Sequence, residues 1–270
     1  MRTVYEMEES AAALFLETAR NHKITCAARP AQFTRIMRQN TGMVGELLPW
    51  GHEKDGLERH NPLIVAIGDS VTAGHFENLQ PLNGPFDKTR PIEIADPREV
   101  YHEKFRRKLI DTYEQTSVSV LNAGIAGDTI FGMEQRLKRD VLSHNPDLVL
   151  INGTINWQPD KTTADFRQAL IRMIDRVRSE TQADLILMTP NPVIWSSQDM
   201  HRLFRERIDC VRDLSAKQNI CLADICGIWE EFLKSGYPLR KMLSNKTSHP
   251  TKTGHEVCAL ELMKLVVEAE

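Results

Sequence analysis

The sequence predicts an α/β protein of three layers, in which helices cover both faces of a central parallel sheet of about five strands. Two observations carry this prediction. From residue 63 onward, short apolar runs typical of strands alternate with amphipathic helical segments. The links between them are short, as in parallel strands joined by right-handed helical crossovers. Residues 1–60 lack this alternation, and we expect them to form a helical and irregular extension packed on a main domain at residues 61–270.

The elements follow in order along the chain. Each expected strand is a short apolar run bounded by turn residues. The strands are residues 63–67, 117–124, 146–153, 183–190 and 219–224. Each expected helix has apolar residues at helical spacing. The helices are residues 8–20 and 31–39 in the extension, then 96–115, 129–143, 162–180 and 199–217, and after the fifth strand further helices that end with residues 253–268. Asp96 is placed to cap the third of these helices, with Pro97 in its first turn.

Composition narrows the class of protein. The chain has 270 residues, 41% hydrophobic and 26% charged, as in an ordinary soluble globular protein. Its net charge of −3 gives no general electrostatic footprint for nucleic acid. No apolar run approaches the roughly 20 residues of a membrane span. The N-terminal segment has no basic lead before an apolar core, so we expect no signal peptide and a cytoplasmic location.

Four motifs fall where expected strands end or just before the last helix. They are GDSVTAG after the first strand, NAGIAGDT after the second, INGTINW after the third and SHPTKTGH before the final helix. The loops at the carboxyl ends of parallel strands meet at one edge of the sheet. We therefore expect Ser70, Gly127, Asn156 and His249 to converge, although they are spread over most of the domain.

The residue types at this edge are those that nucleophilic catalysis requires. A serine hydroxyl needs a base within hydrogen-bond reach, and histidine is best matched to that task near neutral pH. The attacked carbonyl becomes an oxyanion, which needs preorganised donors. Glycines let backbone N–H groups approach a ligand, and an asparagine donates from its side-chain amide. The absence of G-x-S-x-G argues against the nucleophile elbow of α/β-hydrolases.

On these four ordered motifs, over roughly residues 62–270, the sequence resembles the SGNH, or GDSL-type, hydrolase superfamily of esterases and lipases. The resemblance implies a flavodoxin-like fold and a serine esterase that needs no metal or organic cofactor. It implies Ser70 as the nucleophile and His249 as the base. It also implies an oxyanion hole formed by the N–H groups of Ser70 and Gly127 and by the side chain of Asn156. The analogy favours small acyl esters or carbohydrate O-acetyl esters as substrates.

The third motif departs from the family pattern, which is G-x-N-D. An ungapped match places Ile155 at the position of the donor, and isoleucine cannot donate. We prefer Asn156, with the loop shifted by one residue, and keep Asn152 as the alternative. Asp69 and Trp157 are candidates for substrate binding. The other interpretations are that Asp69 forms the turn and that Trp157 packs beneath the cleft.

The last motif departs as well, because the family usually has D-x-x-H. Here Lys246 stands three residues before His249. Asn245 is a possible orienter of the imidazole through its amide oxygen. Asp224, after the fifth strand, is another, and the alternative for Asp224 is a structural role. The remaining alternative is a Ser–His dyad whose histidine is held by backbone carbonyls.

Two other histidines and two other functions compete with this interpretation. His255 lies inside the final helix, where we expect it to pack or to face solvent, and His75 is close to Ser70 in sequence. The missing acid is consistent with a catalytically impaired ligand-binding protein. An acyltransferase that uses the same nucleophile but excludes water is the second rival. The sequence does not determine the oligomeric state.

Overall fold

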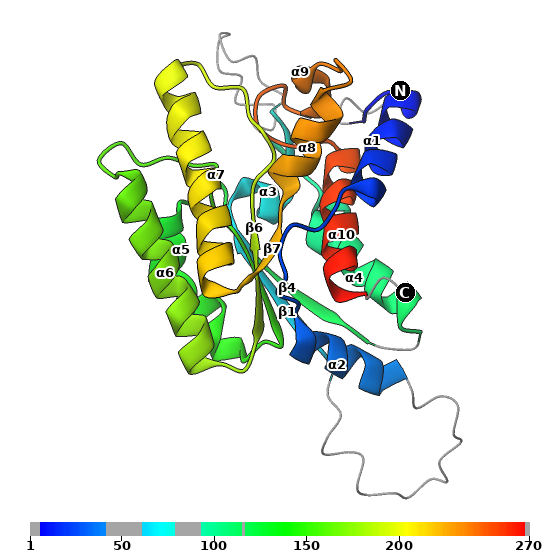
Figure 1. Cartoon of the computed structure of the whole chain (residues 1–270), viewed down its shortest axis with the longest axis vertical. Coiled ribbons are helices and arrows are strands. Elements are labelled where there is room, and N and C mark those ends of the chain that lie inside the picture. The colour runs from blue at the N-terminus through cyan, green and yellow to red at the C-terminus, as the bar shows by residue number, and fades with distance from the viewer. Residues whose placement is uncertain (1–5, 42–60, 79–92, 115–116, 268–270) are drawn as a thin grey trace, which may run out of the picture.

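The computed structural model describes residues 6–41, 61–78, 93–114 and 117–267. In that part of the chain, five strands form one parallel sheet in the order β4-β1-β5-β6-β7 (Figure 1). The strands are β1 (Leu63–Gly68), β4 (Ser119–Gly124), β5 (Leu148–Asn152), β6 (Asp184–Met188) and β7 (Cys221–Ala223). Every neighbouring pair in this sheet runs parallel. The predicted central sheet is thereby confirmed.

The strand order reverses beside the first motif. Numbered by chain order, the five strands lie in the order 2-1-3-4-5, which is that of flavodoxin-like folds. Gly68, the last residue of β1, pairs with Gly124 of β4 on one side and with Asn152 of β5 on the other. Ligands of such sheets bind beyond the carboxyl ends of the strands, where the strand order reverses. That switch point lies between β1 and β5, next to Ser70.

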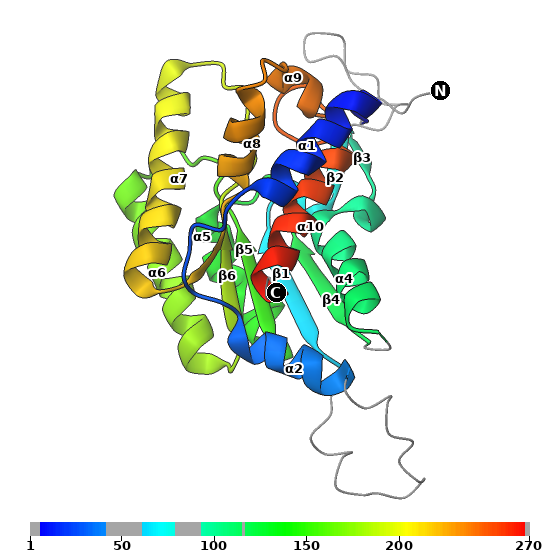
Figure 2. The ribbon, with the colours of Figure 1, turned by 45° about the vertical axis from the view of Figure 1, so that its right-hand side comes forward.

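Helices cover both faces of the sheet, because strand side chains point alternately to either side. Ile64 and Ala66 of β1 belong to one core, and Val65 and Ile67 belong to the other. The helices on the first face are α1 (Glu9–Asn21), α4 (Tyr101–Thr112), α8 (Ile225–Leu233) and α10 (Lys252–Val266). Those on the second face are α5 (Ile130–Asp140), α6 (Thr163–Glu180) and α7 (Gln198–Gln218). Figures 1 and 2 show these three layers.

The two N-terminal helices pack on the main domain. Helix α1 lies along α10 and α8 (Figure 2), where the Phe15 ring stacks on Phe232 with centroids 4.6 Å apart. Helix α2 (Ala31–Thr41) is attached at the amino end of β6, because Phe33 N donates to Asp184 Oδ2 at 2.7 Å. The predicted boundary after residue 60 adjoins residues 42–60, which lie outside the described residues, and it stays a prediction.

Some shorter elements differ from the sequence prediction. The helix expected at residues 96–115 begins as a 3₁₀ turn, Pro97–Glu99, and continues as α4 only after Val100, whose ψ of 152° is extended. The helix expected at residues 129–143 ends as α5 at Asp140, with a 3₁₀ turn after it. The elements that the sequence did not predict are α3 (Ser70–Ala73) and the antiparallel pair β2 (His75–Asn78) and β3 (Glu93–Ala95). The helices expected without bounds between the fifth strand and the last helix are α8 and α9 (Leu239–Met242).

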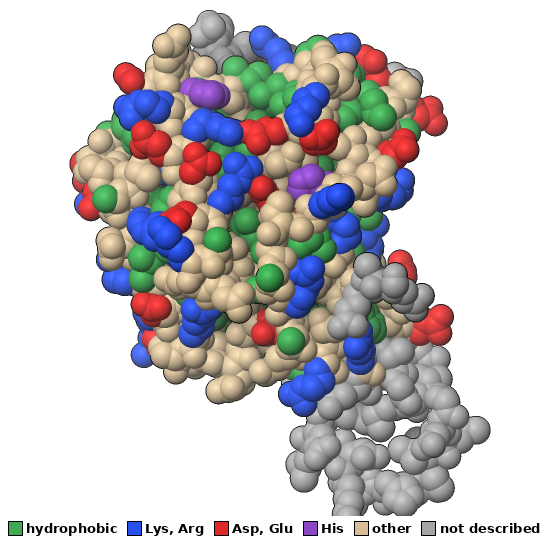
Figure 3. All heavy atoms as spheres, viewed as in Figure 1, with side chains coloured by type: hydrophobic (Ala, Val, Ile, Leu, Met, Phe, Trp, Pro, Cys, Tyr) green, Lys and Arg blue, Asp and Glu red, His purple; other side chains and the backbone are tan. Residues whose placement is uncertain are grey.

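The surface shows how the charges of the chain are distributed. On the face drawn in Figure 3, basic and acidic side chains of the described residues intermingle rather than gather in a patch of one sign. No helix in the described part of the chain is long and apolar enough to cross a membrane.

Candidate active site

Strand β1 leads directly into the serine of the first motif. A Cβ on Gly68 would lie only 2.0 Å from Thr72 Oγ1, so glycine is required for the close turn that follows. Asp69 caps α3, since its Oδ1 accepts a hydrogen bond from Val71 N at 3.0 Å. Ser70 is the first residue of this one-turn helix and is 8% exposed. The turn therefore holds the Ser70 side chain at the carboxyl edge of the sheet.

The last motif brings a histidine to that serine. His249 Nε2 lies 3.0 Å from Ser70 Oγ, and His249 Nδ1 lies 3.3 Å from the carbonyl oxygen of Phe76. When Nδ1–H donates to this carbonyl, Nε2 is left to accept the hydroxyl proton of Ser70. Two residues that are 179 positions apart in the sequence thus form a hydrogen-bonded pair of the kind that can activate a nucleophile.

Asn245 shapes the loop before His249 but does not contact the imidazole. Its Oδ1 accepts three backbone N–H groups, from Thr247 (3.1 Å), Ser248 (2.8 Å) and His249 (2.9 Å). The expected bond from the Asn245 amide oxygen to the ring is therefore not formed, because backbone donors occupy that oxygen. The Phe76 carbonyl lies at Nδ1, as in the alternative in which backbone carbonyls hold the histidine.

The loop after β6 fixes this last loop from the other side. Asn191, which is 3% exposed, donates through Nδ2 to the Ser248 carbonyl at 2.8 Å. The N–H of Ile194 donates to the Thr247 carbonyl at 2.8 Å. Strand β6 and the residues that follow it therefore help to set the height of His249 above the sheet edge.

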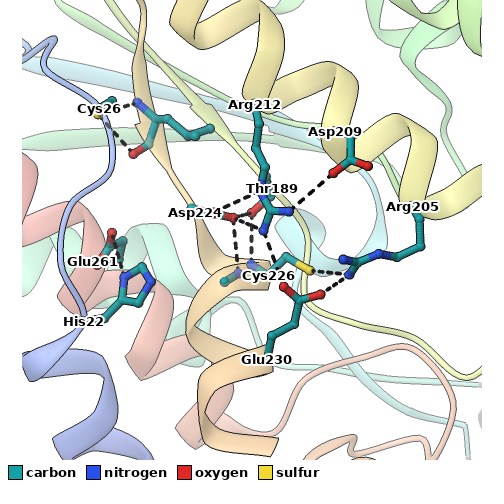
Figure 4. Close-up of polar contacts among 12 residues, drawn as sticks. His22, Cys26, Thr189, Arg205, Asp209, Arg212, Asp224, Cys226, Glu230 and Glu261 are labelled. Carbon is teal, nitrogen blue, oxygen red and sulfur yellow. Dashed lines mark hydrogen bonds and ion pairs between the residues drawn. The ribbon is translucent and has the colours of Figure 1, made fainter.

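Asp224, the other candidate orienter, serves the fold at another place. Its carboxylate accepts from Arg212 Nε and Nη2, both at 3.0 Å, and from Thr189 Oγ1 at 2.8 Å (Figure 4). It also caps α8 by accepting from Gly227 N. These bonds engage both oxygens, so Asp224 has the structural role that was the alternative to orienting the imidazole.

The competing histidines are placed differently from His249. His255 is fully buried, its ring lies parallel to that of Tyr101, and its Nδ1 accepts from Tyr101 N at 3.2 Å. Burial lowers the pKa of His255 well below its ordinary value. It packs in the core, as one of the two alternatives anticipated. The His75 ring lies beside His249, with centroids 6.3 Å apart.

The second and third motifs are bound to one another. Asn156 Nδ2 donates at 2.9 Å to the carbonyl of Asp128, the residue that follows Gly127. Gly127 has a φ of 74°, in the left-handed region that favours glycine, and a Cβ there would meet nothing within 4 Å. The two loops that carry the expected oxyanion donors therefore lie side by side, with open space at Gly127.

The two alternatives to Asn156 are both buried. Ile155 is 5% exposed and packs in a small cluster with Val71 and Phe204. Asn152 is buried at the end of β5, and its Oδ1 has no hydrogen-bond partner among the described residues. Asn156 is the one of the three whose amide reaches the loop of the second motif.

The two candidates for substrate binding have different surroundings. Asp69 is fully buried beneath the turn, so it does not face a substrate, and the expectation that it binds one is wrong. Trp157 is 37% exposed and borders a small apolar cavity. The other aromatic and aliphatic residues around that cavity are Ile155, Trp195, Met200, Leu203 and Phe204. Trp157 is thus both packed against its neighbours and partly exposed, and its part in substrate binding stays a prediction.

Two contributors to this site were not found by sequence reasoning. One is the Phe76 carbonyl at His249 Nδ1, and the other is Arg136, whose guanidinium donates to the Gly68 carbonyl below Ser70 at 3.0 Å. Both act through backbone carbonyls, which every residue type carries, so no motif signals them. Within the described ranges, no cluster of three or more His, Cys, Asp and Glu residues is placed to hold a metal ion.

Comparisons with known proteins match this architecture. A profile of the GDSL-like lipase/acylhydrolase family matches residues 66–257. The sequence is similar to an acetylxylan esterase of Geobacillus stearothermophilus, with 26% identity over 163 residues, which are 56% of this chain and 74% of that protein.

Solved structures of similar proteins share the fold. A lipase/acylhydrolase from Enterococcus faecalis has 26% sequence identity and a TM-score of 0.58, covering 76% of this chain and 95% of its own. An acetylxylan esterase from G. stearothermophilus has 22% identity and a TM-score of 0.59, covering 77% of this chain and 95% of its own. The family profile spans all four motifs and most of the sheet that positions them. The chain therefore belongs to the GDSL-like lipase/acylhydrolase family and is a carboxylic ester hydrolase.

Proposed function

We propose that the protein is a serine esterase that hydrolyses small acyl esters, with an O-acetyl group on a carbohydrate as the preferred substrate. The observation that carries the proposal is the 3.0 Å contact between Ser70 Oγ and His249 Nε2 at the carboxyl edge of the sheet. Similarity to an acetylxylan esterase supports the acetyl group and the carbohydrate. The partner of this site is thus a small-molecule ester.

In the first half-reaction, Ser70 Oγ attacks the acyl carbonyl carbon while His249 Nε2 takes the hydroxyl proton. The Phe76 carbonyl accepts from Nδ1–H and so favours the imidazolium that forms. The N–H groups of Ser70 and Gly127 and the Asn156 amide bind the oxyanion. The bond to the alcohol then breaks, His249 protonates the leaving oxygen, and the acyl group remains on Ser70.

In the second half-reaction, water replaces the alcohol. His249 Nε2 takes a proton from the water as its oxygen attacks the acyl carbon, and the same donors hold the second oxyanion. The bond from the acyl carbon to Ser70 Oγ breaks, and His249 returns the proton to that oxygen. The products are a carboxylic acid, an alcohol and the free enzyme.

The test is hydrolysis of p-nitrophenyl acetate by the purified protein and by four variants. Ser70→Ala and His249→Ala should each lower kcat by roughly 10³-fold or more. Asn156→Ala should lower kcat by roughly 10²- to 10³-fold with little change in KM. His75→Ala is the matched histidine control and should retain most of the activity. A fluorophosphonate probe should label the wild type, and mass spectrometry should place the adduct on Ser70.

Several outcomes would change the assignment. Full activity in Ser70→Ala, with labelling at another residue, would overturn the nucleophile. A large loss in Asn152→Ala without one in Asn156→Ala would move the oxyanion donor to Asn152. Acyl transfer to added alcohols in preference to water would indicate an acyltransferase, and ester binding without turnover would indicate a binding protein. Esters of increasing acyl length, together with acetylated xylo-oligosaccharides, test the substrate class.

A further inference from the structure

We infer that Arg136 is a positioning residue for the oxyanion hole, because its guanidinium fastens together the loops that carry the three proposed donors. The inference rests on the proposed function, since it concerns the same donors. Arg136 itself touches neither the nucleophile nor the base in this structure. Its effect passes through the backbone on which Ser70, Gly127 and Asn156 are mounted.

The guanidinium of Arg136 lies beneath the sheet edge, and the residue is 8% exposed. Nη2 donates to the Gly68 carbonyl at 3.0 Å, and Nη1 donates to the Ala123 carbonyl at 2.7 Å. Nε donates to Asp128 Oδ2 at 2.7 Å, and Nη1 also bonds Asp140 Oδ2 at 2.9 Å. One planar group thus joins the carboxyl ends of β1 and β4 to the second motif. A lysine ammonium lacks the fixed fork of donors that this arrangement uses.

Asp128 connects Arg136 to two of the proposed donors, the N–H of Gly127 and the amide of Asn156. Its N–H closes a turn to the Ile125 carbonyl at 3.1 Å, and its Oδ1 accepts from Thr129 N at 2.8 Å. Its own carbonyl accepts the Asn156 amide at 2.9 Å. A Cβ on Gly127, between Ile125 and Asp128, would meet no atom within 4 Å. The direction of the Gly127 N–H therefore depends on the turn and on what anchors Asp128.

The space for Asp128 is built into helix α5. A Cβ on Gly132 would lie 1.9 Å from Asp128 Oδ1, so the carboxylate occupies the place of a side chain on that helix. Glycine is less favourable than alanine inside a helix. A glycine in the first turns of α5 thus makes room for the carboxylate that Arg136 binds.

The Gly68 carbonyl connects Arg136 to the third proposed donor, the N–H of Ser70. This oxygen accepts from Arg136 Nη2 and from Ile125 N, the latter at 3.1 Å. Ser70, whose N–H is a proposed donor, follows two residues later through the buried turn at Asp69. A shift of the guanidinium would therefore displace both the first and the second motif.

Two carboxylates on the same guanidinium provide a matched comparison. Asp128 and Asp140 both form ion pairs with Arg136, at 2.7 and 2.9 Å, and both are largely buried. Only Asp128 belongs to the loop of the second motif, whereas Asp140 ends α5. If Arg136 only stabilised the fold, the two carboxylates would be equivalent in their effect on catalysis.

The experiment compares Asp128→Asn with Asp140→Asn on p-nitrophenyl acetate, after Ser70→Ala has tested the proposed function itself. We expect Asp128→Asn to lower kcat by roughly 10- to 100-fold with KM and the acidic limb of the pH–rate profile unchanged. Asp140→Asn should keep kcat within about twofold. Arg136→Lys should lose as much as Asp128→Asn, and the double variant should lose no more than either single variant, because the residues act as a unit.

Turnover is expressed per site titrated by the fluorophosphonate probe, and melting curves confirm that each variant is folded at the assay temperature. If Asp128→Asn does not fold, Arg136→Lys is judged against Arg172→Lys, whose ion pair with Glu134 is partly exposed. Equal kcat values for the two asparagine variants, or for the two lysine variants, would overturn the inference. Wild-type activity in Ser70→Ala would instead show that the proposed function is wrong.

Discussion

At the scale of single residues, Asp69 of the first motif has a carboxyl group that is buried away from water. Its side chain is fully buried, Oδ1 accepts from Val71 N, and Oδ2 has no hydrogen-bond partner in the described part of the chain. Burial, reinforced by the negative charge of Asp128, raises the pKa of Asp69 to about 7. The group therefore takes up a proton on folding at mildly acidic pH.

This shift predicts a pH dependence of stability. Because the pKa of Asp69 is higher in the folded than in the unfolded state, the folded state binds more protons between about pH 4 and pH 7. The free energy of unfolding should fall as pH rises through that window. Asp69→Asn, which keeps an oxygen for Val71 N, should remove that part of the slope. Urea unfolding of both proteins at several pH values measures the difference.

The comparison of the two proteins isolates Asp69 from the other ionisable groups. The variant should gain stability relative to wild type as pH rises from about 4 to about 8. Parallel pH profiles for the two proteins would mean that Asp69 stays ionised in the folded state.

At the scale of elements, the loop between α9 and α10 is organised by one side chain. Lys246 has a φ of 67°, a left-handed conformation that costs energy for a residue with a Cβ. Asn245 Oδ1 accepts hydrogen bonds from the three N–H groups that follow Lys246, those of residues 247–249. Ser244 N donates to the His249 carbonyl at 2.8 Å. These bonds offset the strain and fix the backbone of His249.

Removing that acceptor should misplace the base. Asn245→Ala leaves three backbone donors without their acceptor, and we expect kcat to fall by roughly tenfold and the melting temperature to decrease. Asn245→Asp keeps the acceptor oxygen and should retain most of the activity. Steady-state kinetics and thermal melts of both variants test this. Equal losses in the two variants would show that the amide bond to Ser248 Oγ matters more than the oxygen.

At the scale of the whole molecule, helix α1 is part of the packed core. Phe15 is fully buried between Phe232 and Trp229, with ring centroids 4.6 and 5.2 Å away. Lys264 of α10 donates to the carbonyls of Ala19 and His22 at the end of α1. The helix thus covers a face that would otherwise expose aromatic side chains to water.

Truncating Phe15 should therefore destabilise the molecule while leaving the site intact. Phe15→Ala should lower the free energy of unfolding by about 3–5 kcal/mol, whereas Leu14→Ala, at a position that is 47% exposed, should change it by about 0.5 kcal/mol or less. Denaturant unfolding measures both, and kcat below the melting transition should match wild type. An unchanged unfolding curve for Phe15→Ala would mean that α1 adds no stability to the cooperative unit.

Much of the architecture could be predicted because its signals are local. Strands β1 and β5 are apolar runs, and helices α6 and α7 have apolar residues at helical spacing. Each pattern shows which side chains must be buried, whatever the partner element is. The short pair β2 and β3 escaped prediction because pairing with a distant partner, rather than the composition of either strand, defines it. The early end of α5 at Asp140 is likewise a matter of packing, since its sequence continues to suit a helix.

For the site, the sequence by itself determined that Ser70 and His249 meet, and the tertiary structure decided how each is held. Parallel strands deliver their carboxyl ends to one edge, so motifs placed after strands predicted the approach of Ser70 to His249. The partners of that pair are backbone carbonyls and N–H groups brought from distant segments, which carry no residue-specific signal. Only their positions in space turned Asn245 toward the backbone, placed the Phe76 carbonyl at the imidazole and buried Asp69.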